Sequence, residues 1–290
     1  MFKNICLGSA LVVPILLTAL TLCLFYNSLE TWQQLGIGFL FSREWNPVEN
    51  RFGALSAITG TLLTTGIALG IAVPFGFLTA YCLMGVPGWF ERPLSYALDL
   101  LASIPSVIYG LWGLFILVPI MQNRVQPFIT DSLGLKYVPF FGSQFNGFGF
   151  LTAGLVLSIM ILPYISAVIR DVFHLTPPLL REAAYGLGCT RWEATWHITA
   201  RYGAKGILGG IFIGLGRALG ETMAVLFVIG NVIHLPGSVY DSGTTIAATL
   251  ANNFSEADGL MRSVLFALGL VLLALSFIVQ YAARKCLVPR

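Results

Sequence analysis

The chain has 290 residues, of which 57% are hydrophobic and only 10% are charged, and its formal net charge is +3. A soluble domain has roughly 45–50% apolar and about 25% charged residues, so this composition excludes an ordinary soluble protein and indicates a polytopic membrane protein. The chain also lacks the clustered basic face that nucleic-acid binding requires, so no nucleic acid is expected as a partner.

Six apolar runs are long enough to cross a bilayer, which takes about 20 residues of helix. They are Ile5–Tyr26, Leu55–Leu83, Leu94–Ile120, Phe148–Ile169, Gly206–Asn231 and Met261–Ala283. The first run is too long for a signal peptide, and no small-x-small cleavage site follows it, so we expect a retained helix. The runs therefore predict an all-α membrane protein with six transmembrane helices.

The distribution of Lys and Arg predicts the orientation of these helices. An even number of helices places both termini on one side of the membrane. With the N-terminus inside, the inner segments hold Lys3, Arg92, Arg170, Arg181, Arg191, Arg201, Lys205, Arg284, Lys285 and Arg290. The outer segments hold only Arg43, Arg51, Arg124, Lys136 and Arg262. This bias predicts cytoplasmic termini and a multi-pass protein of the cytoplasmic (inner) membrane, in contact with membrane lipid.

The second predicted helix carries three threonines, Thr61, Thr64 and Thr65. Threonine in an apolar helix usually bonds to a backbone carbonyl one turn back. The alternative interpretation is that Thr64 lines a substrate path.

The third predicted helix is interrupted by Pro105, because a proline inside a membrane helix frees a backbone carbonyl. Ser103, Ser106 and Tyr109 stand close enough in sequence to satisfy the freed group. Alternatively, the two serines and the freed backbone face a pore and contact an oxyanion.

The long inner segment His174–Gly206 is expected to form two short helices. Thr176 is predicted to cap the first helix, with Pro177 at its first position, where the missing N–H does no harm. Gly188 suits the left-handed conformation that ends a helix.

The second of these short helices begins with a capping box formed by Thr190 and Glu193. Trp192 and Trp196 are four residues apart and therefore share one face of it. The spacing fits a hairpin that lies against its own bundle, and it fits equally a knob that docks into another protein.

The fifth predicted helix contains Arg217 and Glu221 in an apolar stretch, "GLGRALGETMAVLFVIGN", and the two charges share a face if the helix is continuous. The same face carries Gly206, Gly210, Gly214, Ala224 and Val228. Glycines at every fourth position let another helix approach closely. We therefore expect this face, with both charges, to be packed against protein.

Two interpretations of the charged residues remain open. An isolated charge at mid-membrane costs about 2.5–3.5 kcal/mol, and an apolar pair of equal volume is often no less stable than an ion pair. In the first interpretation, Arg217 and Glu221 form an ion pair that fixes helix register. In the second, Arg217 faces a translocation path and binds an anion, because its planar fork matches a tetrahedral oxyanion, and Glu221 holds or releases it.

The inner segment resembles the EAA loop of binding-protein-dependent ABC-importer permeases. "EAAYGLG", residues 182–188, followed by Ile198, matches the pattern Glu-Ala-Ala, three residues, Gly, nine residues, Ile-x-Leu-Pro. Ala200 and Arg201 stand where the pattern has Leu-Pro, the usual stop of the second helix. In that family the loop inserts into a groove on a cytoplasmic ATPase. The resemblance implies coupling roles for Glu182, Ala183, Ala184, Gly188, Arg191 and Trp192.

A second resemblance is to the PstC type of permease subunit in bacterial phosphate-specific ABC importers. "GRALGETMAV", Gly216–Val225, is similar to the signature of its fifth helix, and Phe52–Gly76 and Arg92–Pro119 are similar to its second and third helices. The resemblance covers roughly residues 46–283. It implies a type I importer (MetI-like) bundle with a cytoplasmic coupling hairpin, and inorganic phosphate as substrate. It also implies a PstA-like sister permease, a PstB-like ATPase dimer and a PstS-like binding protein as partners.

This resemblance divides the chain into an N-terminal helix with an outer loop (1–54), a permease core (55–283) and a cytoplasmic tail (284–290). The expected substrate path contains Arg217, Glu221, Ser103, Ser106 and Thr64. The five cysteines form no Cys-x-x-Cys pair and the histidines lie far apart, so we expect neither a metal site nor a cofactor. No P-loop motif is present, so the chain is not expected to be an enzyme, and a partner hydrolyses ATP.

Two alternative functions remain open at this point. A permease of the same architecture could carry another oxyanion, such as molybdate or sulfate. A gradient-driven carrier or a structural membrane subunit is the other alternative. A carrier built from inverted repeats should show two similar halves, and the first half has no counterpart of Gly216–Val225.

Overall fold

The computed structural model describes residues 2–132 and 145–287, and most of these residues are helical. The long helices are α1 (Phe2–Asn27), α4 (Leu55–Leu83), α5 (Gly88–Ser103), α8 (Phe150–His174), α12 (Ala204–Gly220) and α15 (Gly259–Leu287). The strands described are β1 (Trp45–Asn46) and β2 (Arg51–Phe52), which pair antiparallel in the connection between α1 and α4. The predicted all-α class is therefore confirmed.

Shorter helices connect the long ones. The first connection holds α2 (Leu29–Gln34) and α3 (Gly38–Phe41). After α5 the chain continues through α6 (Ser106–Trp112), α7 (Val118–Ile120) and π-helical turns at Gly113–Leu117, Met121–Val125 and Phe128–Ser132. The hairpin after α8 consists of α9 (Pro178–Gly186), α10 (Arg191–Glu193), a π-helical turn at Ala194–Thr199, and α11 (Ala200–Tyr202). Helices α13 (Met223–Leu226) and α14 (Ile246–Asn253) precede α15.

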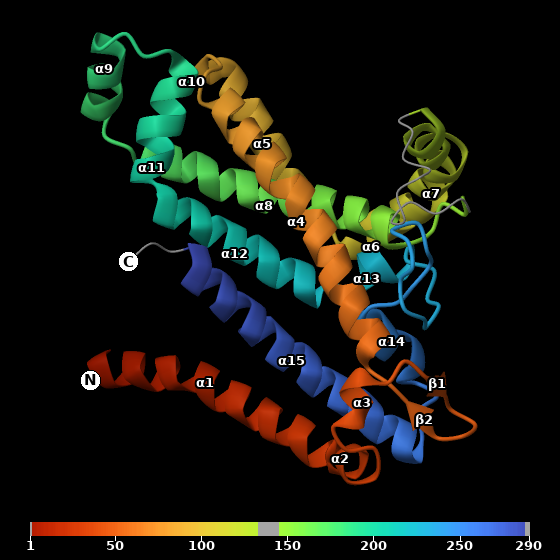
Figure 1. Ribbon diagram of the computed structural model, residues 1–290. Coiled ribbons are helices and arrows are strands. Elements are labelled where there is room, and N and C mark those ends of the chain that lie inside the picture. Colours follow the sequence, from red (N-terminus) through yellow and green to blue (C-terminus); the bar gives the residue numbers. More distant parts are fainter. Residues whose placement is uncertain (1, 133–144, 288–290) are drawn as a thin grey trace.

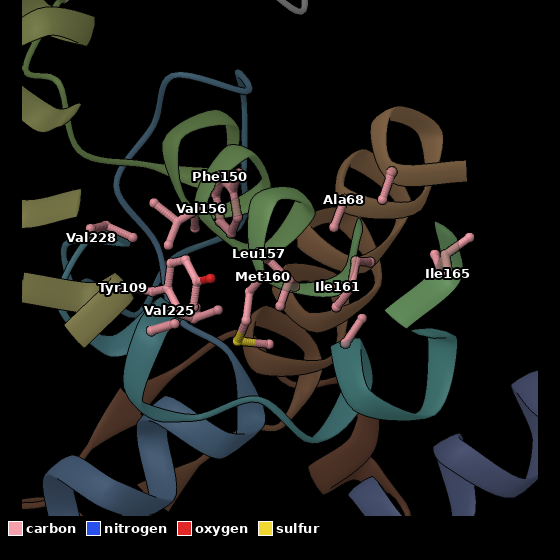
Figure 2. Close-up of a cluster of buried hydrophobic side chains, with 14 of the residues drawn as sticks. Ala68, Tyr109, Phe150, Val156, Leu157, Met160, Ile161, Ile165, Val225 and Val228 are labelled. Atoms are coloured by element: carbon pink, nitrogen blue, oxygen red, sulfur yellow. The ribbon is translucent and has the colours of Figure 1, made fainter. Parts of the chain in front are cut away.

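Helix α8 is the centre of the bundle. In its most apolar stretch 67% of the residues are buried, against 28% in α4 and none in Gly8–Asn27 of α1. Figure 2 shows Leu157, Met160 and Ile161 of α8 between Ala68 of α4 and Tyr109 of α6. Side chains that project from α8 therefore meet the helices on both sides of it.

Three glycines of α12, spaced four residues apart, lie against α8, as their spacing predicts. A β-carbon on Gly206 would lie 2.5 Å from Cγ2 of Val172, and one on Gly214 would lie 2.8 Å from Cδ1 of Ile165. A β-carbon on Gly210 would lie 2.9 Å from Cγ1 of Val168. The two helices approach closely because these positions carry no side chain, which confirms the glycine part of the predicted packed face.

In the residues that the structure describes, five helices are long and apolar enough to cross a membrane. They are Gly8–Asn27, Leu55–Leu83, Ser106–Thr130, Phe150–His174 and Gly259–Lys285. Four of these correspond to the first, second, fourth and sixth predicted helices. The third predicted helix, Leu94–Ile120, is wrong in its bounds, because the chain breaks between Ser103 and Ser106 and the apolar span begins after the break.

The predicted fifth helix, Gly206–Asn231, is also wrong as a continuous element. Helix α12 has 17 residues, which is about 25 Å at 1.5 Å per residue, and it ends at Gly220. Glu221 is extended, with φ −73° and ψ 127°, and the helix resumes only at Met223. Glycine is a poor helix former, and two glycines near the end of α12, Gly216 and Gly220, weaken the helix where it stops.

The two ends of the molecule differ in what they carry (Figure 1). The start of α1, the end of α15 and the α9–α11 hairpin lie at one end, and α2, α14 and the β1–β2 strands lie at the other. A second apolar cluster at the latter end joins α3, α4, α14 and α15 through Phe39, Ala57, Ile246 and Leu265. The start of α1 and the end of α15 therefore lie on the same side of the molecule as the hairpin.

Candidate functional site

Arg217 lies in the last turn of α12 and is half-buried. Its guanidinium carbon lies 4.4 Å from the centroid of the Tyr164 ring in α8, a distance typical of a cation–π contact. Its Nε atom is buried and has no hydrogen-bond partner among the described residues. No acidic oxygen of residues 2–132 or 145–287 forms an ion pair with it.

Glu221 is not the partner of Arg217, and the prediction that the two share a helical face is wrong. The helix ends at Gly220, so the backbone turns before Glu221 is reached. The Glu221 carboxylate instead accepts a hydrogen bond from the backbone amide of Ala224, with Oε1 at 3.2 Å. It therefore satisfies a free N–H at the start of α13, as a capping side chain does.

The break in the third helix lies where Pro105 predicts it, and hydroxyl groups satisfy the carbonyls that the break leaves free. Ser103 Oγ donates to the Leu100 carbonyl at 2.8 Å, and Tyr109 donates to the Leu101 carbonyl at 2.8 Å. The Tyr164 hydroxyl donates to the Ala102 carbonyl. Ser103 and Tyr109 thus bond to carbonyls at the break, as the simpler interpretation expects. Tyr164 comes from a different helix and was not predicted.

The other predicted path residues, Thr64 and Ser106, make no hydrogen bond with Arg217 among the described residues. The hydroxyl of Thr64 is buried and bonds within its own helix, to the Gly60 carbonyl at 2.9 Å, which agrees with the simpler interpretation of this threonine. Ser106 is half-buried at the first position of α6. The structure thus joins Arg217 to the helix break near Ser103 through Tyr164.

A cavity of about 290 Å³ lies beside the break, but it is apolar. Its lining consists of Leu101, Ile104, Ile108, Tyr109, Trp112 and Ile159. An oxyanion that enters a cavity without hydrogen-bond donors gives up its hydration and gains nothing in return. The free-energy cost is large, so this cavity is unsuited to an oxyanion. In this region, the guanidinium of Arg217 is a group that can bind an oxyanion.

The first helix of the hairpin begins differently from the prediction and ends as predicted. Pro177 occupies the cap position without a side-chain bond, and the Thr176 hydroxyl is buried with no partner among the described residues, so the predicted Thr176 cap is wrong. Gly188 has φ +84°, the left-handed conformation that was expected. Its amide bonds to the Tyr185 carbonyl, and the amide of Cys189 bonds to the Ala184 carbonyl, a Schellman arrangement.

The second helix of the hairpin has the predicted capping box. The amide of Thr190 donates to the Glu193 carboxylate at 2.7 Å, and the amide of Glu193 donates to the Thr190 hydroxyl at 3.3 Å. Gly203 provides the stop that Leu-Pro provides in the family pattern. A β-carbon on Gly203 would lie 2.2 Å from Cγ1 of Val172, so only glycine fits this close approach to α8.

This second helix is bound to its own bundle by aromatic side chains. Trp192 and Trp196 are stacked with ring centroids 5.8 Å apart, and both meet the ring of Phe77 in α4 edge-on. Arg191 lies over the ring of Tyr81 and donates to its backbone carbonyl at 3.1 Å. For α10 and the turn that follows it, the interpretation as a hairpin against its own bundle therefore holds.

Comparisons with known proteins identify the family. The sequence profile of the family described as "Binding-protein-dependent transport system inner membrane component" matches residues 72–289. A protein of Xylella fastidiosa named "Phosphate transport system permease protein PstC" is 47% identical over 99% of this chain and 89% of its own length. This chain belongs to the PstC family. A Pasteurella multocida protein of the same name is also 47% identical, over 95% of this chain and 87% of its own length.

Solved structures show the same bundle for this PstC-family chain. A chain of a bacterial alginate ABC transporter, solved with an alginate-bound periplasmic protein, has a TM-score of 0.63 over 98% of this chain and 94% of its own, at 19% identity. A chain of the MetNI methionine ABC transporter has a TM-score of 0.52 over 81% of this chain and 93% of its own, at 16% identity. The fold is therefore that of an ABC importer permease of the MetI-like type, in a multi-pass inner-membrane component of a transport system.

In this PstC-family chain the EAA-loop residues lie on α9 and the turn after it. Glu182, Ala183 and Gly188 are exposed, and Ala184 is buried. Leu179 and Leu187 flank them with 75% and 87% of their surface exposed. Helix α9 lies at the tip of the hairpin (Figure 1). Its exposed leucines therefore form an apolar surface there.

Proposed function

We propose that this chain is a permease subunit of an ABC importer that carries inorganic phosphate across the cytoplasmic membrane, energised by a partner ATPase. Arg217 is the observation that carries the proposal. It is a cation in a membrane-spanning bundle that pairs with no carboxylate of the described residues, and its Nε is buried without a partner. A guanidinium fork matches the oxygens of phosphate, and relatives that are 47% identical are named phosphate transport permeases.

The partners we propose follow from the surfaces of the chain and from its family. A PstB-like ATPase dimer contacts the exposed apolar surface of α9, where Leu179 and Leu187 face outward. Glu182, Ala183, Ala184 and Gly188 shape that contact, while Arg191 and Trp192 fasten the hairpin to α4. A PstA-like permease completes the path, and a PstS-like protein delivers phosphate at the end that carries β1 and β2. Both termini then face the cytoplasm.

Phosphate uptake by the whole complex tests this function. Proteoliposomes would contain the permease pair and the ATPase, with ATP inside and phosphate-loaded binding protein outside. Arg217→Gln should assemble normally and reduce uptake of labelled phosphate at least about tenfold, because each tenfold change corresponds to about 1.4 kcal/mol of lost interaction. Arg284→Gln removes the same charge at an exposed position in α15 and should leave uptake unchanged.

Further variants separate anion binding from an ion pair that fixes helix register. Glu221→Gln should keep most uptake, because its amide oxygen can still accept the Ala224 amide. The exchange of Arg217→Glu with Glu221→Arg should not restore uptake, because the two residues do not pair in this structure. If the exchange does restore uptake, Arg217 and Glu221 form an ion pair that fixes helix register. The substrate path must then be sought at Ser103 and Ser106.

The same vesicles test the alternative functions. Excess sulfate or molybdate should not compete with labelled phosphate in a phosphate permease, whereas competition would indicate another oxyanion. Uptake should require ATP in the lumen. Uptake driven by an ion gradient without ATP would indicate a carrier instead.

A further inference from the structure

Tyr164 lies between two features of the bundle. One is the guanidinium of Arg217 in α12, and the other is the break between α5 and α6. The guanidinium carbon of Arg217 lies 4.4 Å from the centroid of the Tyr164 ring. The hydroxyl of the same side chain donates to the Ala102 carbonyl in the last turn of α5. One residue of the central helix α8 therefore contacts both.

An aromatic ring stabilises an arginine differently from a carboxylate. A carboxylate accepts the N–H groups of the guanidinium and neutralises its charge, so it competes with an incoming anion for the same atoms. The face of a ring attracts the cation without accepting an in-plane N–H group. In the part of the chain that the structure describes, Arg217 forms no ion pair, so its charge is not neutralised. Its Nε is buried and has no hydrogen-bond partner among those residues.

The hydroxyl of Tyr164 acts at the carboxyl end of a helix, where backbone carbonyls lack partners. In α5 the Leu100 and Leu101 carbonyls are satisfied by Ser103 and Tyr109, which follow in the same part of the chain. The Ala102 carbonyl is satisfied from α8 instead. Tyr164 therefore fastens the end of α5 to the helix whose ring face supports Arg217.

We propose that Tyr164 is a positioning residue for Arg217, whose ring holds the guanidinium in the bundle with its N–H groups free for a tetrahedral oxyanion. Its hydroxyl ties this support to the α5–α6 break, so that the arginine and the break move together. The proposal rests on the proposed function, since it concerns how Arg217 receives phosphate.

The ratio of phosphate transported to ATP hydrolysed tests the proposal in the complete complex. In the proteoliposomes described above, with saturating phosphate-loaded binding protein, uptake and hydrolysis are measured on the same samples. Tyr164→Leu should lower the ratio about tenfold, which lies in the range that an arginine–aromatic stack supplies. A general loss of folding or assembly lowers both rates and leaves their ratio unchanged, so the ratio reports positioning.

Two hydroxyl variants serve as matched controls. Tyr164→Phe keeps the ring and loses the donor to Ala102, so the ratio should stay near the original value while both rates fall together. Tyr109→Phe removes the neighbouring donor to Leu101 and should behave in the same way. If Tyr164→Phe lowers the ratio as much as Tyr164→Leu, the ring is not what positions Arg217, and the proposal is wrong.

Fluorinated phenylalanines at position 164 keep the test decisive if the Leu variant does not assemble. Fluorination preserves the shape of the ring and weakens the negative potential of its face, so the ratio should fall stepwise with each added fluorine. An unchanged ratio across the series would overturn the proposal.

The same ratio distinguishes failure of this inference from failure of the proposed function. If Arg217→Gln itself keeps the ratio, the proposed function of Arg217 fails. If only the series at position 164 has no effect, the inference about Tyr164 alone fails.

Discussion

Glu193 holds the start of the second hairpin helix through hydrogen bonds to a single residue. Its carboxylate accepts the Thr190 amide at 2.7 Å and the Thr190 hydroxyl at 2.7 Å. These bonds, and to a smaller extent the charge of His197, hold the pKa of Glu193 below its ordinary value of 4.5. Because the pKa is lower in the folded hairpin, this stabilisation is fully present above the ordinary value and is lost as the pH falls through the folded value.

Amide hydrogen exchange of residues 191–196 should follow this titration. After correction for intrinsic rates, protection should be constant from neutral pH down to the ordinary pKa of glutamate. It should decrease as the pH falls further and the carboxylate takes up a proton. Glu193→Gln should show lower protection without the acid step. Thr190→Ala should lower protection at neutral pH about fivefold, since a lost cap costs about 1 kcal/mol. An acid step that persists in Glu193→Gln would assign it to another group.

At the scale of the element, some glycines of α12 contact side chains of α8, whereas others face open space. In the interior of a helix, Gly→Ala normally stabilises by about 0.5–1 kcal/mol. Gly209→Ala should follow this rule, because no atom of the described residues lies within 4 Å of the added carbon. Gly206→Ala should instead destabilise by about 1–3 kcal/mol, because its β-carbon would overlap Val172.

The thermal midpoint of the detergent-solubilised complex measures this difference. Gly206→Ala should melt below the original protein, and Gly209→Ala should melt at the same temperature or above it. The double variant Gly206→Ala with Val172→Ala should regain part of the loss, because the smaller side chain opens space. Equal effects at both glycines would mean that helix propensity, and not the contact with α8, governs these positions.

At the scale of the whole molecule, the two ends of the bundle should face opposite sides of the membrane. Val48, between β1 and β2, and Leu187, after α9, have 91% and 87% of their surface exposed at the two ends. In a cysteine-free background, Val48→Cys should react with a membrane-impermeant maleimide on intact spheroplasts. Leu187→Cys should react only after permeabilisation, and less when the partner ATPase is bound. The reverse pattern would invert the proposed orientation.

Much of the bundle follows from patterns that are local in the chain. Runs of about 20 apolar residues predict membrane helices because bilayer thickness sets their length, and four of the predicted helices have a counterpart in the structure. The Thr190 capping box, the left-handed Gly188 and the break at Pro105 were equally predictable, because each depends on a few adjacent residues. The glycine spacing of α12 indicated a packed face for the same reason.

The partner of Arg217 is the main feature that the sequence could not supply. Helical spacing pointed to Glu221, but this holds only if the helix continues, and the backbone leaves the helix at Gly220. The only local signal for Tyr164 is a single tyrosine beside Pro163 in a mostly apolar helix.

The sequence by itself determined a polytopic membrane protein, most of its helices, the hairpin and the face of α12 that is packed. The tertiary structure decided which side chain meets the cation. Local spacing says which residues share a face, whereas a contact between α8 and α12 depends on the crossing and register of two helices. That register is set where Gly206, Gly210 and Gly214 meet Val172, Val168 and Ile165, and it brings the Tyr164 ring under Arg217.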